Sequence, residues 1–217
     1  MERSISNQEI ANVLREYSVV ADAKSSLVAA IQVYISLLLQ WNRSISLTTV
    51  TDPEEIVRFH FGESFFAASA VPITSGRLAD VGSGAGFPGL PLKMLIPALD
   101  LVLVESNAKK ATFLAEVHRK LALDRVRVFR GRMEKLSAEE STGTVEGFDF
   151  ITARAFGQFG DLLVWASHHL TKLGRICLWL GEDDLAVVSE NDDWSWDAPI
   201  RIPASKRRFI LTGSIRQ

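Results

Sequence analysis

The sequence predicts an α/β protein in which a mostly parallel sheet follows a helical N-terminal region. Apolar residues recur at spacings of three and four through residues 1–70, which is the period of one helix face. Beyond residue 71, short apolar runs alternate with helical stretches, and a glycine-rich turn joins the first run to the helix after it. Such alternation indicates parallel strands with helices on both faces of the sheet.

Residues 1–70 contain three predicted helices. The clearest has one apolar face, formed by Leu27, Ile31, Tyr34, Leu38 and Trp41. A shorter helix is expected over residues 10–17. A third begins at Asp52–Glu55, where a capping Asp, a first-turn Pro and a Glu three residues after the cap coincide.

Residues 71–217 form the second predicted region. Its expected strands are Leu78–Val81, Leu101–Val104, Val126–Phe129, Phe148–Thr152 and Arg175–Leu180. Its expected helices are Leu90–Ile96, Ala108–Leu121 and Phe159–Leu170. Ile200–Ile202 and Phe209–Leu211 predict an antiparallel C-terminal hairpin, and the polar segment Ser137–Gly147 predicts a loop.

Composition excludes several classes of protein. The formal net charge is -2, so the chain as a whole is not a polybasic nucleic-acid binder, although a local basic face remains possible. Cys177 is the single cysteine, so an internal disulfide cannot form. The four histidines lack metal-ligand spacing, and apolar runs stay well short of the roughly 20 residues that span a bilayer. We therefore expect a cytoplasmic protein without a metal, a membrane anchor or an obligate protein partner.

The stretch Asp80–Gly89 is the most informative part of the chain. It follows a predicted strand and opens a predicted helix, and its glycines allow a tight turn and close approach of a ligand to the backbone. Glu105 follows Gly86 by 19 residues and ends the second strand. A carboxylate at that place can accept hydrogen bonds from ribose hydroxyls, so the pattern predicts a nucleoside-type cofactor.

Two cofactor classes fit this glycine pattern. A dinucleotide needs free amides at a helix N-terminus to hold its pyrophosphate, and Pro88 and Pro91 each remove one such donor. S-adenosylmethionine has no phosphate and does not need them. The predicted C-terminal hairpin also favours S-adenosylmethionine, and an NAD(P)-dependent oxidoreductase remains the alternative.

A family resemblance runs along most of the chain. Asp80–Gly89 followed by Leu90-Pro91-Leu92 resembles the cofactor loop of the bacterial small-subunit (16S) ribosomal RNA methyltransferase G family, also called glucose-inhibited division protein B. Further motifs of this family are resembled by Trp41-Asn42, Leu47-Thr48, Asp52–Glu55, His60, Glu63-Ser64, Glu105-Ser106, Lys109-Lys110, Phe113-Leu114, Arg132–Glu134 and Ala153–Ala155.

The resemblance implies a Rossmann-like class I methyltransferase that transfers a methyl group from S-adenosyl-L-methionine to guanine N7 in the decoding-region loop of 16S ribosomal RNA. Residues 71–217 would then be the cofactor-binding domain. Carried over by position, the residues that would contact the cofactor are Gly82, Gly84 and Phe87 in the loop, Glu105, Ser106 and Asn107 at the ribose, Met133 and Glu134 at the adenine, and Arg154, which would also be catalytic.

An RNA-binding surface needs positive charge to contact phosphates and planar groups to stack on bases. Residues 106–135 contain nine Lys or Arg and only three Asp or Glu. The expected RNA-binding residues are Lys109, Lys110, Arg132, Arg207 and Arg208. Phe87, Phe156 and Arg154 are candidates for stacking on a base. A solvated helix face is the alternative interpretation of any single Lys or Arg.

The chemistry of guanine N7 fits a chain without an evident catalytic base, because N7 has a free lone pair. Cytosine C5 chemistry would need a thiol nucleophile, and Cys177 lies within an apolar run that predicts burial. Two departures from the family pattern, Leu180-Gly181 in place of Lys-Gly and Phe59 before His60, leave a third hypothesis open: an inactive cofactor-binding module.

Overall fold

A computed structural model describes residues 5–17, 25–136, 147–203 and 205–216. Within these residues no helix is both long enough and apolar enough to cross a membrane. The predicted loop Ser137–Gly147 lies outside the described residues except for Gly147.

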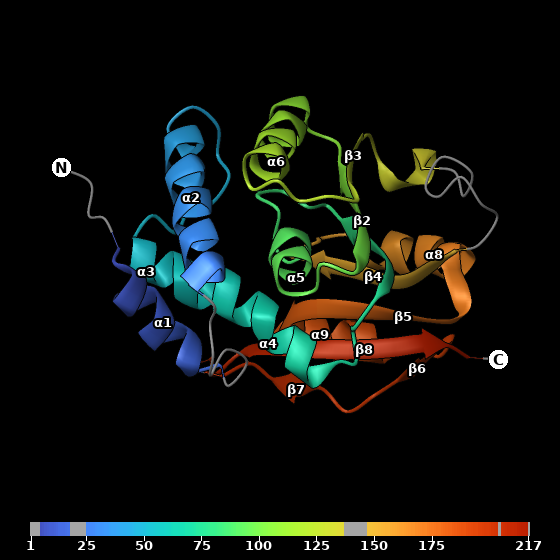
Figure 1. The fold of residues 1–217 in the computed structure, drawn as a ribbon. Coiled ribbons are helices and arrows are strands. Elements are labelled where there is room, and N and C mark those ends of the chain that lie inside the picture. The colour runs from blue at the N-terminus through green and yellow to red at the C-terminus, as the bar shows by residue number, and fades with distance from the viewer. Residues whose placement is uncertain (1–4, 18–24, 137–146, 204, 217) are drawn as a thin grey trace.

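One sheet forms the centre of the molecule (Figure 1). Its strands are β1 Gly76–Val81, β2 Leu99–Glu105, β3 Val126–Arg130, β4 Phe148–Arg154, β5 Leu170–Gly181, β6 Trp194–Trp196, β7 Ile200–Arg201 and β8 Arg208–Ile215. Their spatial order is β3-β2-β1-β4-β5-β8-β6, with β7 also paired to β8. Strands β1 to β5 are parallel, and β8 runs antiparallel to β5, β6 and β7.

This topology confirms the mostly parallel sheet and the antiparallel C-terminal hairpin. Ile200 of β7 pairs with Ile210 of β8, as the apolar pattern predicts. Strand β6 was not predicted; in it Trp194 is buried and stacks on Trp196 with ring centroids 5.4 Å apart. Strand β5 begins five residues before its predicted start, because Leu170–Gly174 carries no apolar alternation.

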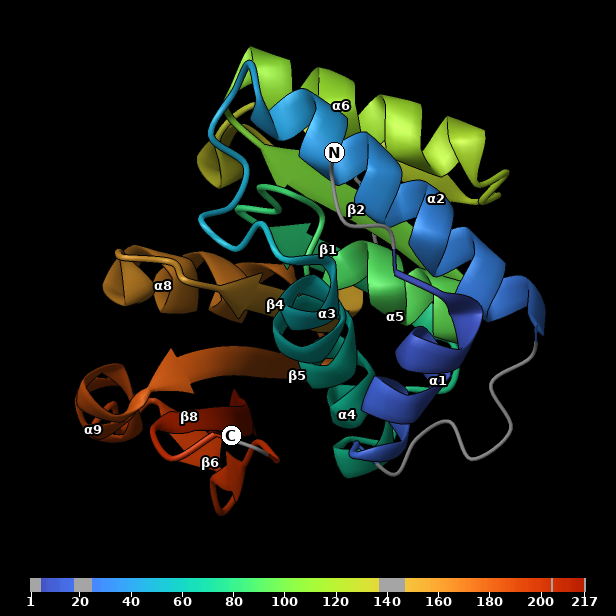
Figure 2. The same ribbon diagram turned by 90° about the vertical axis from the view of Figure 1, so that its left-hand side faces the viewer.

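Helices cover both faces of the sheet. The helices α4 Glu63–Ala70, α5 Gly89–Leu95 and α6 Ala108–Lys120 lie on one face, and α8 Phe159–His169 and α9 Glu182–Ser189 lie on the other (Figures 1 and 2). Two hydrophobic clusters correspond to these two layers. A short 3-10 turn, Met133–Lys135, follows β3.

The N-terminal region contains the three predicted helices. They are α1 Asn7–Arg15, α2 Ser25–Asn42 and α3 Pro53–Ile56, which continues through a π-helical segment, Val57–Gly62, into α4. The Asp52 side chain accepts hydrogen bonds from the amides of Glu54 and Glu55, as its position before a first-turn Pro predicts.

Helix α2 packs against the glycine turn and against α6. The Tyr34 hydroxyl of α2 donates to the Ala85 carbonyl at 2.6 Å, and the Trp41 indole donates to Glu116 of α6 at 3.0 Å. One hydrophobic cluster contains Ile10 and Leu38 together with Leu90 and Ile210. The division of the chain near residue 70 therefore stays a prediction about sequence pattern, because the core is continuous across it.

Candidate active site

The glycine-rich turn lies where the order of the parallel strands reverses. β1 has β2 on one side and β4 on the other, and ligands of open α/β sheets bind outside the carboxyl ends of strands at such a point. Gly82, Gly84 and Gly86 have φ values of 69°, 56° and 89°, which favour glycine. A Cβ on Gly82 would also lie 2.9 Å from the Phe156 ring, so a side chain at this position would have to displace that ring.

Glu105 ties this turn to the start of α6. Its side chain is only 7% exposed; Oε2 accepts from the Gly84 amide at 2.9 Å and Oε1 from the Asn107 amide at 2.7 Å. Each carboxylate oxygen keeps capacity for another donor, so the geometry is compatible with ribose hydroxyls. The Asn107 side chain caps α6 by accepting from the amides of Lys109 and Lys110, a role that Asn before a helix could have indicated.

Two cavities meet at Gly82. The first has a volume of about 510 Å³ and is lined by Asn42, Ser46, Leu47, Thr48, Thr49, His60, Gly82, Ser83, Gly84, Ala85, Phe87, Lys110, Arg154 and Ala155. The second has a volume of about 210 Å³ and is lined by Val81, Gly82, Val104, Ser106, Gly131, Arg132, Met133, Glu134, Phe156 and Gln158. We call them the loop cavity and the strand-end cavity.

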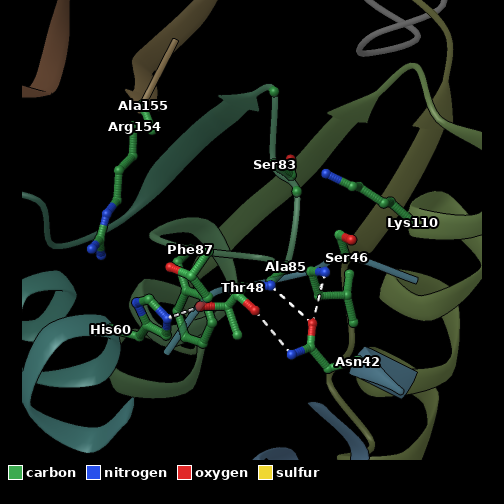
Figure 3. A pocket seen from close by; sticks show the side chains of 14 residues that line it. Asn42, Ser46, Thr48, His60, Ser83, Ala85, Phe87, Lys110, Arg154 and Ala155 are labelled. Atoms are coloured by element: carbon green, nitrogen blue, oxygen red, sulfur yellow. Dashed lines mark hydrogen bonds between the residues drawn. The ribbon is translucent and has the colours of Figure 1, made fainter. Parts of the chain in front are cut away.

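Most predicted site residues are brought together here. Gly82, Gly84, Phe87, Lys110 and Arg154 line the loop cavity, which Lys110 and Arg154 border from opposite sides (Figure 3). The strand-end cavity is lined by four more: Ser106, Arg132, Met133 and Glu134.

Five predicted residues lie elsewhere. Glu105 and Asn107 lie at the junction of β2 and α6. Lys109 is exposed in the first turn of α6. Arg207, just before β8, pairs with Glu182 and Asp183, whereas Arg208 at the start of β8 pairs with the buried Glu63.

The wall opposite the glycine turn was not predicted. Asn42 donates from Nδ2 to the Thr48 carbonyl at 2.9 Å, and its Oδ1 accepts from the amides of Leu47 and Thr48 (Figure 3). The Thr48 hydroxyl in turn lies 2.8 Å from His60 Nε2. These residues were noticed only as parts of the family signature, and the signature alone carried no information about which side chains face the cavity.

His60 and Phe87 form an aromatic stack beneath this wall. Burial, reinforced by the positive charge of Arg154, lowers the pKa of His60 to about 3, so its imidazole is neutral. The Phe87 ring stacks on His60 at 4.7 Å and on Tyr34 at 5.3 Å, and it is 7% exposed. The expectation that Phe87 stacks on a base is therefore wrong, because other side chains already use the ring.

Arg154 and Arg208 share one buried carboxylate. Arg154 Nη2 lies 3.2 Å from Glu63 Oε2, and Arg208 Nη2 lies 2.9 Å from Glu63 Oε1. Glu63 is 1% exposed, so the pair of guanidinium groups provides the charge compensation that a buried carboxylate needs. The Arg208 guanidinium also lies over the Phe59 ring, 4.9 Å from its centroid.

Asp80 anchors the turn from below. Its Oδ1 accepts from the Thr152 hydroxyl at 2.8 Å and its Oδ2 from the Gly89 amide at 3.3 Å. Burial raises the pKa of Asp80 to about 7. The Gly84 and Gly86 amides also donate to protein acceptors, so the turn offers a pyrophosphate few free donors.

Cys177 lies fully buried within β5, and burial raises the pKa of its thiol, as expected of a structural cysteine. Over the described part of the chain, no group of three His, Cys, Asp or Glu side chains is placed to hold a metal ion.

The fold is the Rossmann-like fold of solved methyltransferases. A putative O-methyltransferase from Klebsiella pneumoniae superimposes with a TM-score of 0.64 at 14% identity, covering 97% of this chain and 99% of that one. A SAM-dependent methyltransferase from Aquifex aeolicus gives a TM-score of 0.54 at 15% identity, with coverages of 71% and 90%. At these identities the similarity shows the fold alone.

Sequence similarity identifies the family. Residues 27–197 match the family described as rRNA small subunit methyltransferase G. A ribosomal RNA small subunit methyltransferase G of Xylella fastidiosa (strain 9a5c) is 37% identical over 185 residues, which cover 82% of each protein. Its namesake from Desulfitobacterium hafniense (strain Y51) is 36% identical, covering 85% of this chain and 76% of the relative. The chain belongs to this family, which argues against the NAD(P)-dependent alternative.

Proposed function

We propose that the protein transfers a methyl group from S-adenosylmethionine to N7 of a guanine in the decoding-region loop of 16S ribosomal RNA. The observation that carries the proposal is the meeting of two cavities at Gly82, one for the cofactor's nucleoside and one where its methyl group and the base could come together. Family membership supports ribosomal RNA as the substrate class.

The strand-end cavity fits the adenosine. Met133 is buried and offers an apolar surface, while Ser106 and Glu134 offer polar groups at the rim. Glu105, at the end of β2, accepts the ribose hydroxyls. Because Gly82 lines both cavities, the cofactor can pass along it into the loop cavity, where its methionine end lies along the turn.

The loop cavity then holds the target base beside the side chains of Thr48 and His60. In the reaction the N7 lone pair forms a bond to the methyl carbon while the carbon–sulfur bond breaks, and the positive charge moves from sulfur to the base. A proton does not need to leave, so the side chains align two reactants, an effect worth about 7–11 kcal/mol in favourable cases. The neutral His60 suits this role because it adds no charge beside a base that becomes cationic.

RNA approaches over the mouth of the two cavities. Lys110 and Arg132 line one cavity each, and Lys109 is exposed beside Lys110. These three side chains are the proposed phosphate contacts, and binding should weaken as salt rises. Contacts of Arg207 and Arg208 with RNA stay predictions, since both guanidinium groups are already ion-paired. An RNA substrate of this kind would place the protein in the cytoplasm.

The deciding experiment uses radiolabelled S-adenosylmethionine and small ribosomal subunits from cells that lack the modification. We expect one labelled position, N7 of a single 16S guanine, when the RNA is digested and mapped. Label at another atom or another RNA would overturn the substrate. Cofactor binding without any label would identify an inactive binding module instead.

A further inference from the structure

Glu63 is a buried carboxylate that is ion-paired with Arg154, a residue of the loop cavity. It is 1% exposed, and its ion pairs join α4 to two strands, β4 through Arg154 and β8 through Arg208. A carboxylate so deeply buried is costly unless it is paired.

The backbone of Glu63 is held firmly by its neighbours. Its carbonyl accepts from the Trp179 indole of β5 at 3.2 Å. The preceding Gly62 lies against the Tyr17 ring so closely that a Cβ there would come within 2.4 Å of it. Side chains from the N-terminal region and from the sheet therefore fix where the carboxylate stands.

The two terminal nitrogens of the Arg154 guanidinium differ in their contacts with the protein. Nη2 faces Glu63, whereas Nη1 is buried and has no hydrogen-bond partner among the described residues. The Arg154 side chain is 16% exposed and lines the loop cavity. A buried donor without an acceptor is energetically unfavourable. Arg154 Nη1 is therefore available to a hydrogen-bond acceptor of a ligand.

We propose that Glu63 is a positioning residue for methyl transfer, which fixes Arg154 so that Nη1 donates to the target base. This inference rests on the proposed function. The base acceptor adjacent to N7 is the guanine O6 carbonyl. Glu63 also offsets the charge of Arg154, which would otherwise oppose the positive charge that the base gains. Arg208 is the second cation, and its charge favours the ionised form of Glu63.

Loss of the Arg208 charge should change how kcat depends on pH. Burial raises the pKa of Glu63, and Arg154 and Arg208 act in the opposite direction. The other titratable group facing it is Tyr17, whose pKa is raised to about 12 by burial and then by Glu63 itself, so it stays neutral. Removing Arg208 should raise the pKa of Glu63, and the acid limb of the kcat profile should move to higher pH.

The test uses Glu63→Gln in the full-length protein, with small subunits as substrate. We expect kcat to fall roughly 10–100-fold, as displaced catalytic groups do, with the dissociation constant for S-adenosylhomocysteine within about twofold of the unmodified protein. Glu63→Asp should recover part of kcat because it restores the charge. Glu55→Gln, exposed on the preceding helix α3, is the matched control and should retain activity.

Arg208→Gln keeps the proposal falsifiable if Glu63→Gln does not fold, since the Arg208 side chain is 37% exposed. Its acid limb should move to higher pH, and that of Arg201→Gln, which changes an exposed arginine of the same hairpin, should not. A higher KM for subunits without a pH shift would make Arg208 an RNA contact and overturn its assigned role.

Three results would overturn the inference about Glu63. Unchanged kcat in Glu63→Gln would show that Glu63 does not position Arg154. A loss confined to cofactor affinity would mean that Arg154 serves the cofactor carboxylate. If Glu63→Asp folds but recovers no kcat, the negative charge of the carboxylate is not what positions Arg154. If the unmodified protein itself labels no RNA, the proposed function fails first, and the two failures are distinguishable.

Discussion

At the scale of single residues, burial decides the protonation state of the groups around the loop cavity. His60 lies against Phe87 and beside Arg154, and both desolvation and charge disfavour an imidazolium there. Its pKa in the folded protein is about 3, below the usual value of 6.5. The unfolded chain therefore binds more protons between these two values.

This difference makes stability depend on pH. The contribution of His60 is fully present above about pH 6.5 and is lost as the pH falls toward 3, by about 1.4 kcal/mol per unit. We compare the free energy of unfolding of the unmodified protein with that of His60→Asn. The difference, unmodified minus variant, should fall by about 2 kcal/mol between pH 7 and pH 5. Urea unfolding at both pH values measures it. His168→Asn, at an exposed site, is the control, and an identical difference at both pH values would refute the prediction.

The Glu105 carboxylate should contribute strongly to cofactor affinity. Replacing it with Ala removes the acceptor of the Gly84 and Asn107 amides and of the proposed ribose bonds. Hydrogen bonds to a charged group are worth about 1.5–3 kcal/mol, so affinity for S-adenosylhomocysteine should fall about tenfold or more. Titration calorimetry measures this, with Glu190→Ala, exposed after α9, as the control. An unchanged dissociation constant would remove Glu105 from the cofactor site.

At the scale of elements, the glycine turn is held between α2 and α5. The Tyr34 hydroxyl bonds to the Ala85 carbonyl, and a Cβ on Gly86 would come within 2.3 Å of that hydroxyl and 2.6 Å of Leu90. The turn thus depends on a helix more than 40 residues earlier in the chain. Its shape belongs to the contact between the two elements as much as to its own glycines.

Gly86→Ala tests this contact. A positive φ costs an L-residue about 1–2 kcal/mol, and the clash adds to it, so we expect a loss of about 2 kcal/mol or more in the free energy of unfolding. Gly157→Ala is the matched control, because a Cβ there meets nothing within 4 Å. Equal stability of the two variants in urea unfolding would show that Tyr34 does not restrain the turn.

At the scale of the whole molecule, the N-terminal helices and the sheet share one hydrophobic cluster. Cooperative unfolding follows from such continuity, since exposing one part removes the packing of the other. We expect a single calorimetric transition with a van't Hoff enthalpy equal to the measured one. Two resolved transitions, or a fragment of residues 71–217 with a native near-ultraviolet spectrum, would instead support a separate N-terminal unit.

Local patterns determined the parts of this protein that depend on neighbours in sequence. Strand–helix alternation predicted the parallel sheet, and the Asp52 cap predicted the start of the third helix. Gly82 to Gly86 and the spacing to Glu105 predicted the cofactor turn, since backbone sterics and strand ends set that geometry.

Only the tertiary structure decided which distant side chains meet. Glu63 joins Arg154 and Arg208, and Thr48 joins His60, across separations that leave no periodic signal in the sequence. The same burial that brings these groups together removes water from them. Their ion pairs, protonation and free donors therefore depend on desolvation, which the folded molecule creates and a linear pattern does not contain.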